Sequence, residues 1–225
     1  QNSTNKTEAK KVNKTLKSFL RNPSGTKLNP YNDATRLGQT HTDLNSQLPD
    51  LDTSNKDYQN YLINYLNTLV DCGVDGFRFD AAKHIETPED GEAASDFWPT
   101  VTNAIREKNP DAYIYGEILG LSGLSITAYT KYMSVTDYSY GGTVRSALKS
   151  KKTNTLANYG FSGSEDKDNV LWVESHDTFT TDPKDSASSN KLTIEQQIVG
   201  WAVVGARKDA PALPWHLPAS SHYGR

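Results

Sequence analysis

The fold is decided by one short stretch of this 225-residue chain, Val74-Asp75-Gly76-Phe77-Arg78-Phe79-Asp80. Aromatic and polar residues alternate in it with a period of two, which is typical of a β-strand. In the preceding segment, residues 58–69, tyrosines and leucines recur at intervals of three and four, and Gly73 follows. This pattern predicts an amphipathic helix with a glycine stop. A helix that leads directly into a strand is half of a β/α unit, so the chain is predicted to be an α/β protein.

The same alternation continues toward the C-terminus. Further helices are predicted over residues 97–108, 124–132, 142–151 and 193–206, and further strands over 112–115, 133–137 and 170–173. Residues 210–215 are a candidate for one more strand, although their prolines weaken that prediction. Alternating strands and helices fit either an open doubly wound sheet or a closed eight-stranded barrel.

Two observations favour the barrel. The sequence has no Gly-x-Gly-x-x-Gly turn and no P-loop after any predicted strand. Acidic residues do follow three of the predicted strands, at Asp80, Glu117 and Asp177. Because barrel enzymes carry catalytic residues at the C-terminal ends of several strands, the acids indicate a partial (β/α)8 TIM barrel.

Composition excludes several classes of partner. The chain has 24 basic and 27 acidic residues, which gives no electrostatic reason to expect a nucleic acid or an anionic membrane. Its single cysteine, Cys72, excludes a disulfide within the chain and a cysteine-cluster metal site. The longest apolar stretch, residues 198–206, is well short of the roughly 20 residues that a membrane span needs. We therefore expect neither nucleic acid nor a membrane as a partner.

Residues 1–54 differ in composition from the rest of the chain. They are rich in Asn, Lys, Thr and Ser and contain several turn signals, with one candidate helix near residues 7–20. The regular β/α pattern begins at residue 55. The sequence therefore predicts an irregular lobe over residues 1–54 and a partial catalytic barrel over residues 55–225.

Arg78 and Asp80 are the first candidate site residues. Residues two positions apart in a strand point to the same face, so these two side chains would lie together while Phe77 and Phe79 pack on the other face. A neighbouring guanidinium favours the ionised carboxylate, which is the form that a carboxylate nucleophile needs. From this pattern alone, a buried structural ion pair is an equally good interpretation.

Two more acids follow predicted strands. Glu117 lies in an apolar, aromatic run, where desolvation favours the protonated form that a general acid needs; a strand-end glutamate facing solvent is the alternative. Asp177 ends the run Glu174-Ser175-His176-Asp177, in which a His-Asp pair by itself would most often be structural. Serine hydrolase chemistry is disfavoured because no Gly-x-Ser-x-Gly motif is present. Together, two carboxyl groups of opposite protonation and an accessory acid match the arrangement that glycosidases use.

Three blocks of the sequence resemble the α-amylase family of glycoside hydrolases. They are Gly76-Phe77-Arg78-Phe79-Asp80-Ala81-Ala82-Lys83-His84, Tyr115-Gly116-Glu117-Ile118 and Glu174-Ser175-His176-Asp177-Thr178. Their order is that of the family, and their intervals are similar to those of secreted bacterial members. The resemblance covers roughly residues 28–210. It implies approximately the fourth to the seventh or eighth β/α units of the barrel, preceded by part of the irregular lobe inserted after the third strand.

The resemblance also implies a role for each site residue. Asp80 would be the nucleophile, Glu117 the general acid/base and Asp177 the transition-state stabiliser. Four further matches would orient the nucleophile or hold the sugar: Arg78, Lys83, His84 and His176. Such enzymes hydrolyse internal α-1,4-glucosidic bonds of starch or maltooligosaccharides by retaining double displacement, with the two carboxyl groups about 5–5.5 Å apart.

A structural calcium ion is implied as well. The stretch Leu48-Pro49-Asp50-Leu51-Asp52 resembles the block at the end of the inserted lobe. In that block Asp50 would be a calcium ligand, joined by the backbone carbonyl of His84. Oxygen ligands drawn from distant segments suit calcium. From the residues alone, Asp50 would more often be a turn residue.

The chain departs from the family at both ends. The block that precedes the inserted lobe, a strand ending in Asp followed by Asn-His, is absent, and residues 211–218 do not resemble the expected eighth strand. This predicts a fragment without the first barrel strands and the C-terminal domain, inactive by itself, from a secreted enzyme that is a monomer when complete. Transglycosylation, α-glucosidase action and a catalytically inactive relative are the alternatives.

Overall fold

The computed structural model describes Lys11, Thr15, Ser18, Phe19 and residues 51–91, 94–119, 125–152, 154–180 and 188–214. The chain divides into two compact units, one of Gln1–Ile114 with Leu121–Leu124 and one of Tyr115–Gly120 with Ser125–Arg225. The predicted lobe over residues 1–54 and the helix near residues 7–20 lie almost entirely outside the described residues. Within the described part of the chain, no helix is both long and apolar enough to cross a membrane.

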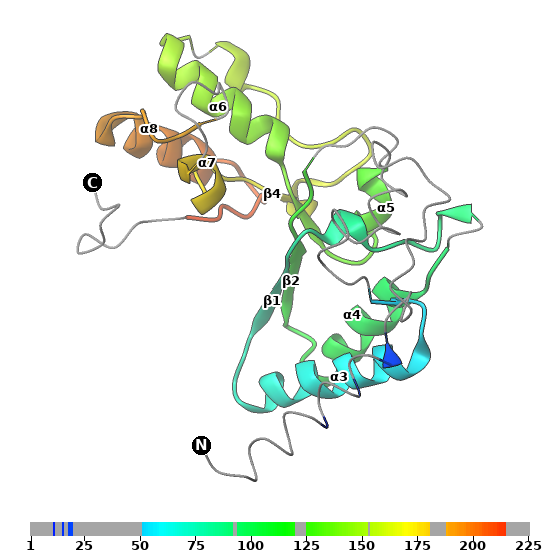
Figure 1. Cartoon of the computed structure of the whole chain (residues 1–225). Coiled ribbons are helices and arrows are strands. Elements are labelled where there is room, and N and C mark those ends of the chain that lie inside the picture. Colours follow the sequence, from blue (N-terminus) through cyan, green and yellow to red (C-terminus); the bar gives the residue numbers. More distant parts are fainter. Residues whose placement is uncertain are drawn as a thin grey trace. The chain divides into compact units, whose positions relative to one another are not determined.

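Helix α3 (Lys56–Asp71) confirms the amphipathic helix predicted in the first unit (Figure 1). The side chain of Asn55 caps it by accepting hydrogen bonds from two backbone N–H groups of the first turn. Gly73 follows with a φ of 93°, a left-handed conformation that favours glycine. The cap and the stop are therefore both local features of the sequence.

Strand β1 (Gly76–Phe79) and helix α4 (Phe97–Lys108) also lie where the sequence predicts them. The aromatic face of β1 packs on α4, with the rings of Phe79 and Trp98 edge to face at a centroid distance of 5.2 Å. Trp98 is fully buried. Because neighbouring side chains of a strand point to opposite faces, this packing leaves Arg78 on the face away from α4.

Gly76 lets β1 approach the next strand closely. A Cβ at this position would collide with the backbone carbonyl of Tyr113, so only glycine fits. One residue earlier, the carbonyl of Asp75 accepts a hydrogen bond of 3.0 Å from the Tyr113 N–H. The start of the predicted β1 run is therefore tied to the start of the following strand.

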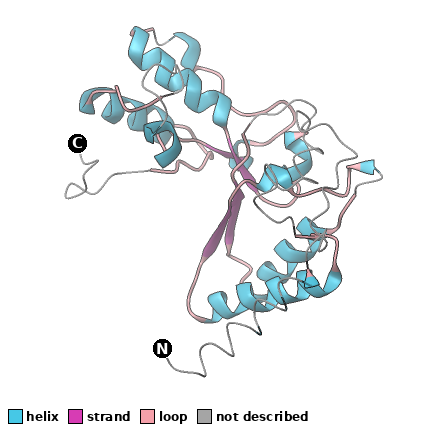
Figure 2. Ribbon diagram, viewed as in Figure 1, coloured by secondary structure: helices cyan, strands magenta, loops and turns pink. Residues whose placement is uncertain are grey.

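The strands form one four-stranded sheet in the order β1-β2-β3-β4, which is also their order along the chain. Figure 2 shows the strands in magenta and the helices in cyan. Strand β3 (Ser134–Thr136) pairs in parallel with both β2 (Tyr113–Gly116) and β4 (Asn169–Val170). A doubly wound sheet reverses its strand order at a switch point, whereas consecutive parallel strands are the order of a barrel. The topology agrees with the predicted partial (β/α)8 barrel.

A short parallel contact follows the end of β4. Leu171 and Ala212 form an isolated parallel bridge. The N–H of Leu171 donates to the carbonyl of Pro211, and the N–H of Leu213 donates to the carbonyl of Leu171, both at 2.8 Å. The candidate strand over residues 210–215 is therefore present only as this one-residue parallel bridge.

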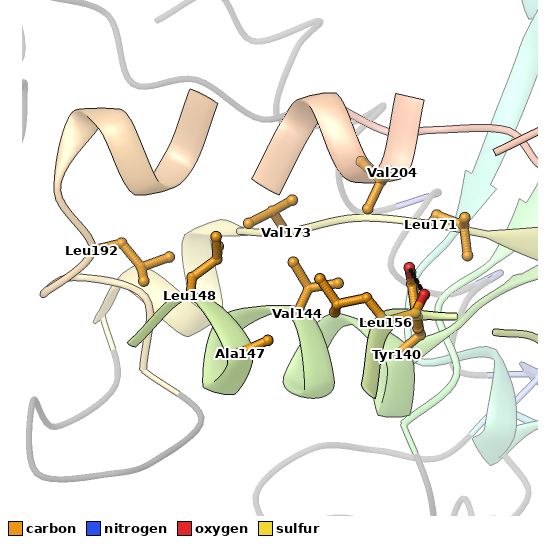
Figure 3. Close-up of a cluster of buried hydrophobic side chains, with 9 residues drawn as sticks. All are labelled: Tyr140, Val144, Ala147, Leu148, Leu156, Leu171, Val173, Leu192 and Val204. Atoms are coloured by element: carbon orange, nitrogen blue, oxygen red, sulfur yellow. Dashed lines mark hydrogen bonds between the residues drawn. The ribbon is translucent and has the colours of Figure 1, made fainter. Parts of the chain in front are cut away.

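The core of the second unit lies between two of its helices and includes residues of the segment that follows β4. Its helices are α5 (Ile126–Thr130), α6 (Tyr138–Ser150), α7 (His176–Thr180) and α8 (Ile194–Gly205), with 3-10 turns η4 (Asn154–Leu156) and η5 (Asp166–Asp168). Figure 3 shows the core between α6 and α8. It consists of Tyr140, Val144, Ala147, Leu148, Leu156, Leu171, Val173, Leu192 and Val204.

Two boundaries in this unit differ most from the predictions, and one of them changes where a site residue lies. Helix α6 starts four residues early because the buried carboxylate of Asp137 caps it, accepting from the N–H of Tyr140 at 2.9 Å. Strand β4 ends at Val170, short of the predicted residue 173. Asp177 therefore does not end a strand, as we expected, but lies in the first turn of α7. The reason is that β3 stops at Thr136, which leaves the residues after Val170 without a β3 partner.

Candidate active site

Asp80 follows β1 directly and pairs with Arg78. The Nη1 atom of Arg78 lies 2.6 Å from Oδ1 of Asp80. The Asp80 side chain is 75% exposed, so this contact is not the buried structural ion pair that the sequence left open. The predicted pairing of Arg78 with Asp80 is confirmed, and the carboxylate is open to a ligand.

The backbone turns sharply after Asp80. Ala81 has a φ of 46°, in the left-handed region that an alanine adopts at a cost of about 1 kcal/mol or more. The turn leads into the 3-10 helix η2 (Ala82–His84), which holds the predicted sugar-binding residues Lys83 and His84. Ala82 is fully buried while Lys83 and His84 are half-buried. The strained residue thus separates the nucleophile candidate from the two residues expected to bind sugar.

A partly buried hydrogen-bonded network anchors this loop in the first unit. The hydroxyl of Thr53 donates to Oε2 of Glu86 at 2.7 Å, and the Gln59 amide donates to the carbonyl of Thr53 at 2.9 Å. The same amide donates to Asp96, which also pairs with Lys56. The hydrogen bond from Lys56, with a smaller contribution from Gln59, lowers the pKa of Asp96 below its ordinary value. The network ties the start of α3 to the chain after η2.

Glu117 is the first residue after β2, as predicted. It is half-buried, between the buried residues Gly116 and Ile118. The hydroxyl of Thr136 binds both backbone groups of Ile118, accepting from its N–H at 2.9 Å and donating to its carbonyl at 3.2 Å. The residues on both sides of Glu117 along the chain are therefore buried, and Ile118 is also held by Thr136.

His176 and Asp177 lie together at the start of α7. Nε2 of His176 is 3.4 Å from Oδ1 of Asp177, and both side chains are more than half exposed. Ser175 is engaged in the local turn, since its hydroxyl accepts from the Thr178 N–H at 3.3 Å. Its own N–H donates to the Thr178 hydroxyl at 2.9 Å. These structural bonds agree with the rejection of Ser175 as a nucleophile.

The segment before α7 is held by a buried arginine of α6. Nη1 of Arg145 donates to the carbonyl of Val173 at 2.9 Å, and its guanidinium lies 5.0 Å from the ring centroid of Trp172. Arg145 is fully buried. The sequence did not single out Arg145, Thr136 or Glu86, because each acts on residues that lie far away along the chain.

The predicted site residues fall into two groups. Arg78, Asp80, Lys83 and His84 belong to the first unit, and Glu117, His176 and Asp177 belong to the second. Asp50 lies outside the described residues. Among the residues that the structure describes, no group of three or more His, Cys, Asp or Glu side chains could hold a metal ion. Calcium binding by Asp50 and the His84 carbonyl therefore stays a prediction.

A sheet whose parallel strands lie in sequence order, with acids directly after β1 and β2, is the architecture of barrel enzymes. Comparison with known proteins identifies the family within this class. The chain matches the family of the alpha-amylase catalytic domain over residues 21–179. It is 32% identical over 201 residues to an alpha-amylase of Butyrivibrio fibrisolvens and 34% identical over 179 residues to one of Clostridium acetobutylicum. Each alignment covers 77% of this chain, but only 20% and 22% of those proteins.

Solved structures agree at the level of the fold. Wild-type alpha-amylase I from Eisenia fetida matches with a TM-score of 0.59 at 21% identity, covering 87% of this chain and 42% of that one. The chain thus belongs to the alpha-amylase catalytic-domain family, which confirms the resemblance. It spans about a fifth of the length of the two bacterial relatives.

Proposed function

We propose that the protein containing this chain hydrolyses internal α-1,4-glucosidic bonds in starch and maltooligosaccharides by retaining double displacement. The observation that carries the proposal is the exposed Asp80 carboxylate, paired with Arg78 at the end of β1, within a chain that matches the alpha-amylase catalytic domain. The matched range, residues 21–179, contains all three acids, Asp80, Glu117 and Asp177. We assign them the roles of nucleophile, general acid/base and transition-state stabiliser.

In the first step, the Asp80 carboxylate attacks the anomeric carbon while Glu117 gives its proton to the departing glycosidic oxygen. Arg78 directs Asp80, because its guanidinium contacts the carboxylate. In the second step, Glu117 takes a proton from water, the hydroxide attacks the anomeric carbon, and Asp80 leaves. Asp177 stabilises the positive charge that develops on the sugar, and His176, Lys83 and His84 bind its hydroxyl groups. The mechanism requires the Asp80 and Glu117 carboxyl groups about 5–5.5 Å apart.

The test uses the full-length protein and measures the release of reducing sugar from starch. Glu117→Gln is expected to lower kcat by at least roughly a hundred-fold, the lower end of what one acid/base group supplies. Asp80→Asn removes the nucleophile and is expected to lower kcat by at least as much. Asp111→Asn is the matched control, since Asp111 is an exposed acid shortly before β2. Full activity of the Asp80→Asn variant would refute the proposal, as would an inverted anomeric configuration of the first product.

Product analysis separates the related chemistries. Endo-hydrolysis predicts a rapid fall in starch iodine staining and a mixture of short maltooligosaccharides. A protein that releases only glucose from chain ends would be an α-glucosidase, and one that builds longer oligosaccharides from maltotriose would be a transglycosylase. Absence of any turnover by the full-length protein would favour a non-catalytic relative.

We also propose a structural calcium ion, with the Asp50 carboxylate and the His84 carbonyl among its ligands, because these oxygen donors are of the kind calcium prefers. A chelator is expected to lower the melting temperature of the full-length protein, and added calcium is expected to restore it.

We further propose that the enzyme is secreted and monomeric. Its presence in culture medium and its elution volume in gel filtration test these two points.

A further inference from the structure

Beyond the end of β2, a side chain of β3 makes the hydrogen bonds that backbone groups make within the sheet. The last registered pair between β2 and β3 is Gly116 with Val135. Beyond it, the Thr136 hydroxyl accepts a hydrogen bond of 2.9 Å from the Ile118 N–H and donates one of 3.2 Å to the Ile118 carbonyl. Thr136 and Ile118 are both buried. One hydroxyl thus satisfies both backbone groups of the residue that directly follows Glu117.

Thr136 itself is held firmly. It is the last residue of β3 and pairs with Val170 of β4. The next residue, Asp137, donates its N–H to the carbonyl of Val170 at 2.9 Å and caps α6 with its side chain. The backbone that carries the Thr136 hydroxyl is therefore held in place by β4, the neighbour of β3 on the side opposite β2.

Glu117 is bounded by these contacts on both sides along the chain. Gly116 is fixed in the ladder, and Ile118 is fixed by the hydroxyl. We infer that Thr136 is a positioning residue for Glu117, an inference that rests on the proposed function. A general acid must lie within hydrogen-bond reach of the oxygen it protonates, and a displacement of about 1 Å costs on the order of a hundred-fold in rate.

The inference predicts a defect that depends on the leaving group. Hydrolysis of a maltooligosaccharide requires protonation of a poor leaving group, so it depends on the position of Glu117. A nitrophenyl α-maltotrioside has a leaving group that departs with little protonation. The value of kcat/KM for both substrates reports the first, glycosylation step, and the ratio of the two values therefore measures acid catalysis.

The experiment compares four variants of the full-length protein. Thr136→Val removes the hydroxyl at nearly constant shape, and Thr136→Ser retains it. Thr102→Val is the matched control: Thr102 is a fully buried threonine of α4 whose hydroxyl donates to the Trp98 carbonyl at 2.7 Å. Glu117→Gln removes the acid and shows the full size of the leaving-group effect. If Thr136→Val yields no folded protein, Thr136→Cys takes its place. A cysteine side chain is similar in size to threonine, and its thiol forms only weak hydrogen bonds.

We expect Thr136→Val to lose roughly ten- to a hundred-fold in kcat/KM on the maltooligosaccharide and less than about threefold on the nitrophenyl substrate. Thr136→Ser and Thr102→Val should keep the wild-type ratio. Equal losses on the two substrates, or an unchanged rate on the maltooligosaccharide, would overturn the inference. An inactive wild-type protein would overturn the proposed function itself, so the two failures are distinguishable.

Discussion

Gly200 of α8 faces the core of the second unit without a side chain, and replacing it by alanine tests how tightly that core is packed. A Cβ at this position would lie 2.9 Å from Cγ1 of Val173 and 3.0 Å from Cδ1 of Leu148. Both neighbours are buried in the cluster of Figure 3. Overpacking a core costs about 1–3 kcal/mol, and a glycine-to-alanine change inside a helix gains about 1 kcal/mol. The net expected effect lies between neutral and about 2 kcal/mol of destabilisation.

Gly205 provides the matched control at the end of the same helix. A Cβ there would meet nothing within 4 Å, so Gly205→Ala should be neutral or stabilising by up to about 1 kcal/mol. In thermal melts of the full-length protein, each kcal/mol corresponds to roughly 2–4 °C for a domain of this size. Gly200→Ala should therefore melt below Gly205→Ala, by up to several degrees.

A double-mutant cycle adds a second readout for the same contact. Val173→Ala should cost less in the Gly200→Ala background than in the wild type, because it removes the atoms that the new Cβ meets. Equal melting temperatures for Gly200→Ala and Gly205→Ala, together with additive effects in the cycle, would refute the close packing of α8 on Val173.

Two further predictions concern the network in the first unit. Because Lys56 and Gln59 lower the pKa of Asp96, the carboxylate contributes stability that is present above its unfolded pKa near 3.8 and is lost as the pH falls through the lower folded pKa. In urea unfolding at neutral pH, Asp96→Asn should lower the free energy of unfolding by less than about 1 kcal/mol, since Asp96 and Lys56 are exposed. This loss of stability should vanish in acid. A loss that persists at about pH 2 would contradict the role given to the Asp96 carboxylate. Thr53→Val leaves the buried Glu86 without the Thr53 hydroxyl and should cost about 1–3 kcal/mol. Loosening the chain after η2 should also raise KM more than it lowers kcat, and an unchanged stability would rule out a structural role for this bond.

Patterns that repeat locally predicted most of the elements. The period of three and four before Gly73 predicted α3, and the two-residue alternation at Phe77 and Phe79 predicted β1 and its packing face. The acids at Asp80 and Glu117 were correctly placed directly after strands for the same reason. In each case the residue pattern that determines the element lies within a few residues of it, so the sequence alone is enough to predict the element.

The errors lie where distant partners decide the structure. The apolar residues after Val170 looked like strand, but β3 has already ended, so they pack into the core as an irregular segment. The start of α7 is an exception, because Ser175 and Thr178 hydrogen-bond each other's backbone, which is a local capping signal. Arg145 carries no such signal, because an arginine on a helix usually faces solvent, and only the tertiary structure shows that it is buried.

The left-handed backbone at Ala81 limits which sequences can occupy the end of β1. A β-branched residue there would meet steric clashes that alanine largely escapes, whereas glycine, asparagine and aspartate adopt this conformation more readily. In a saturation library of residues 76–86 selected for starch clearing, Val, Ile and Thr should disappear from position 81 even though that side chain performs no chemistry. Position 81 would therefore restrict which sequences the neighbouring loop of Lys83 and His84 can adopt, since every variant of that loop must preserve the same turn.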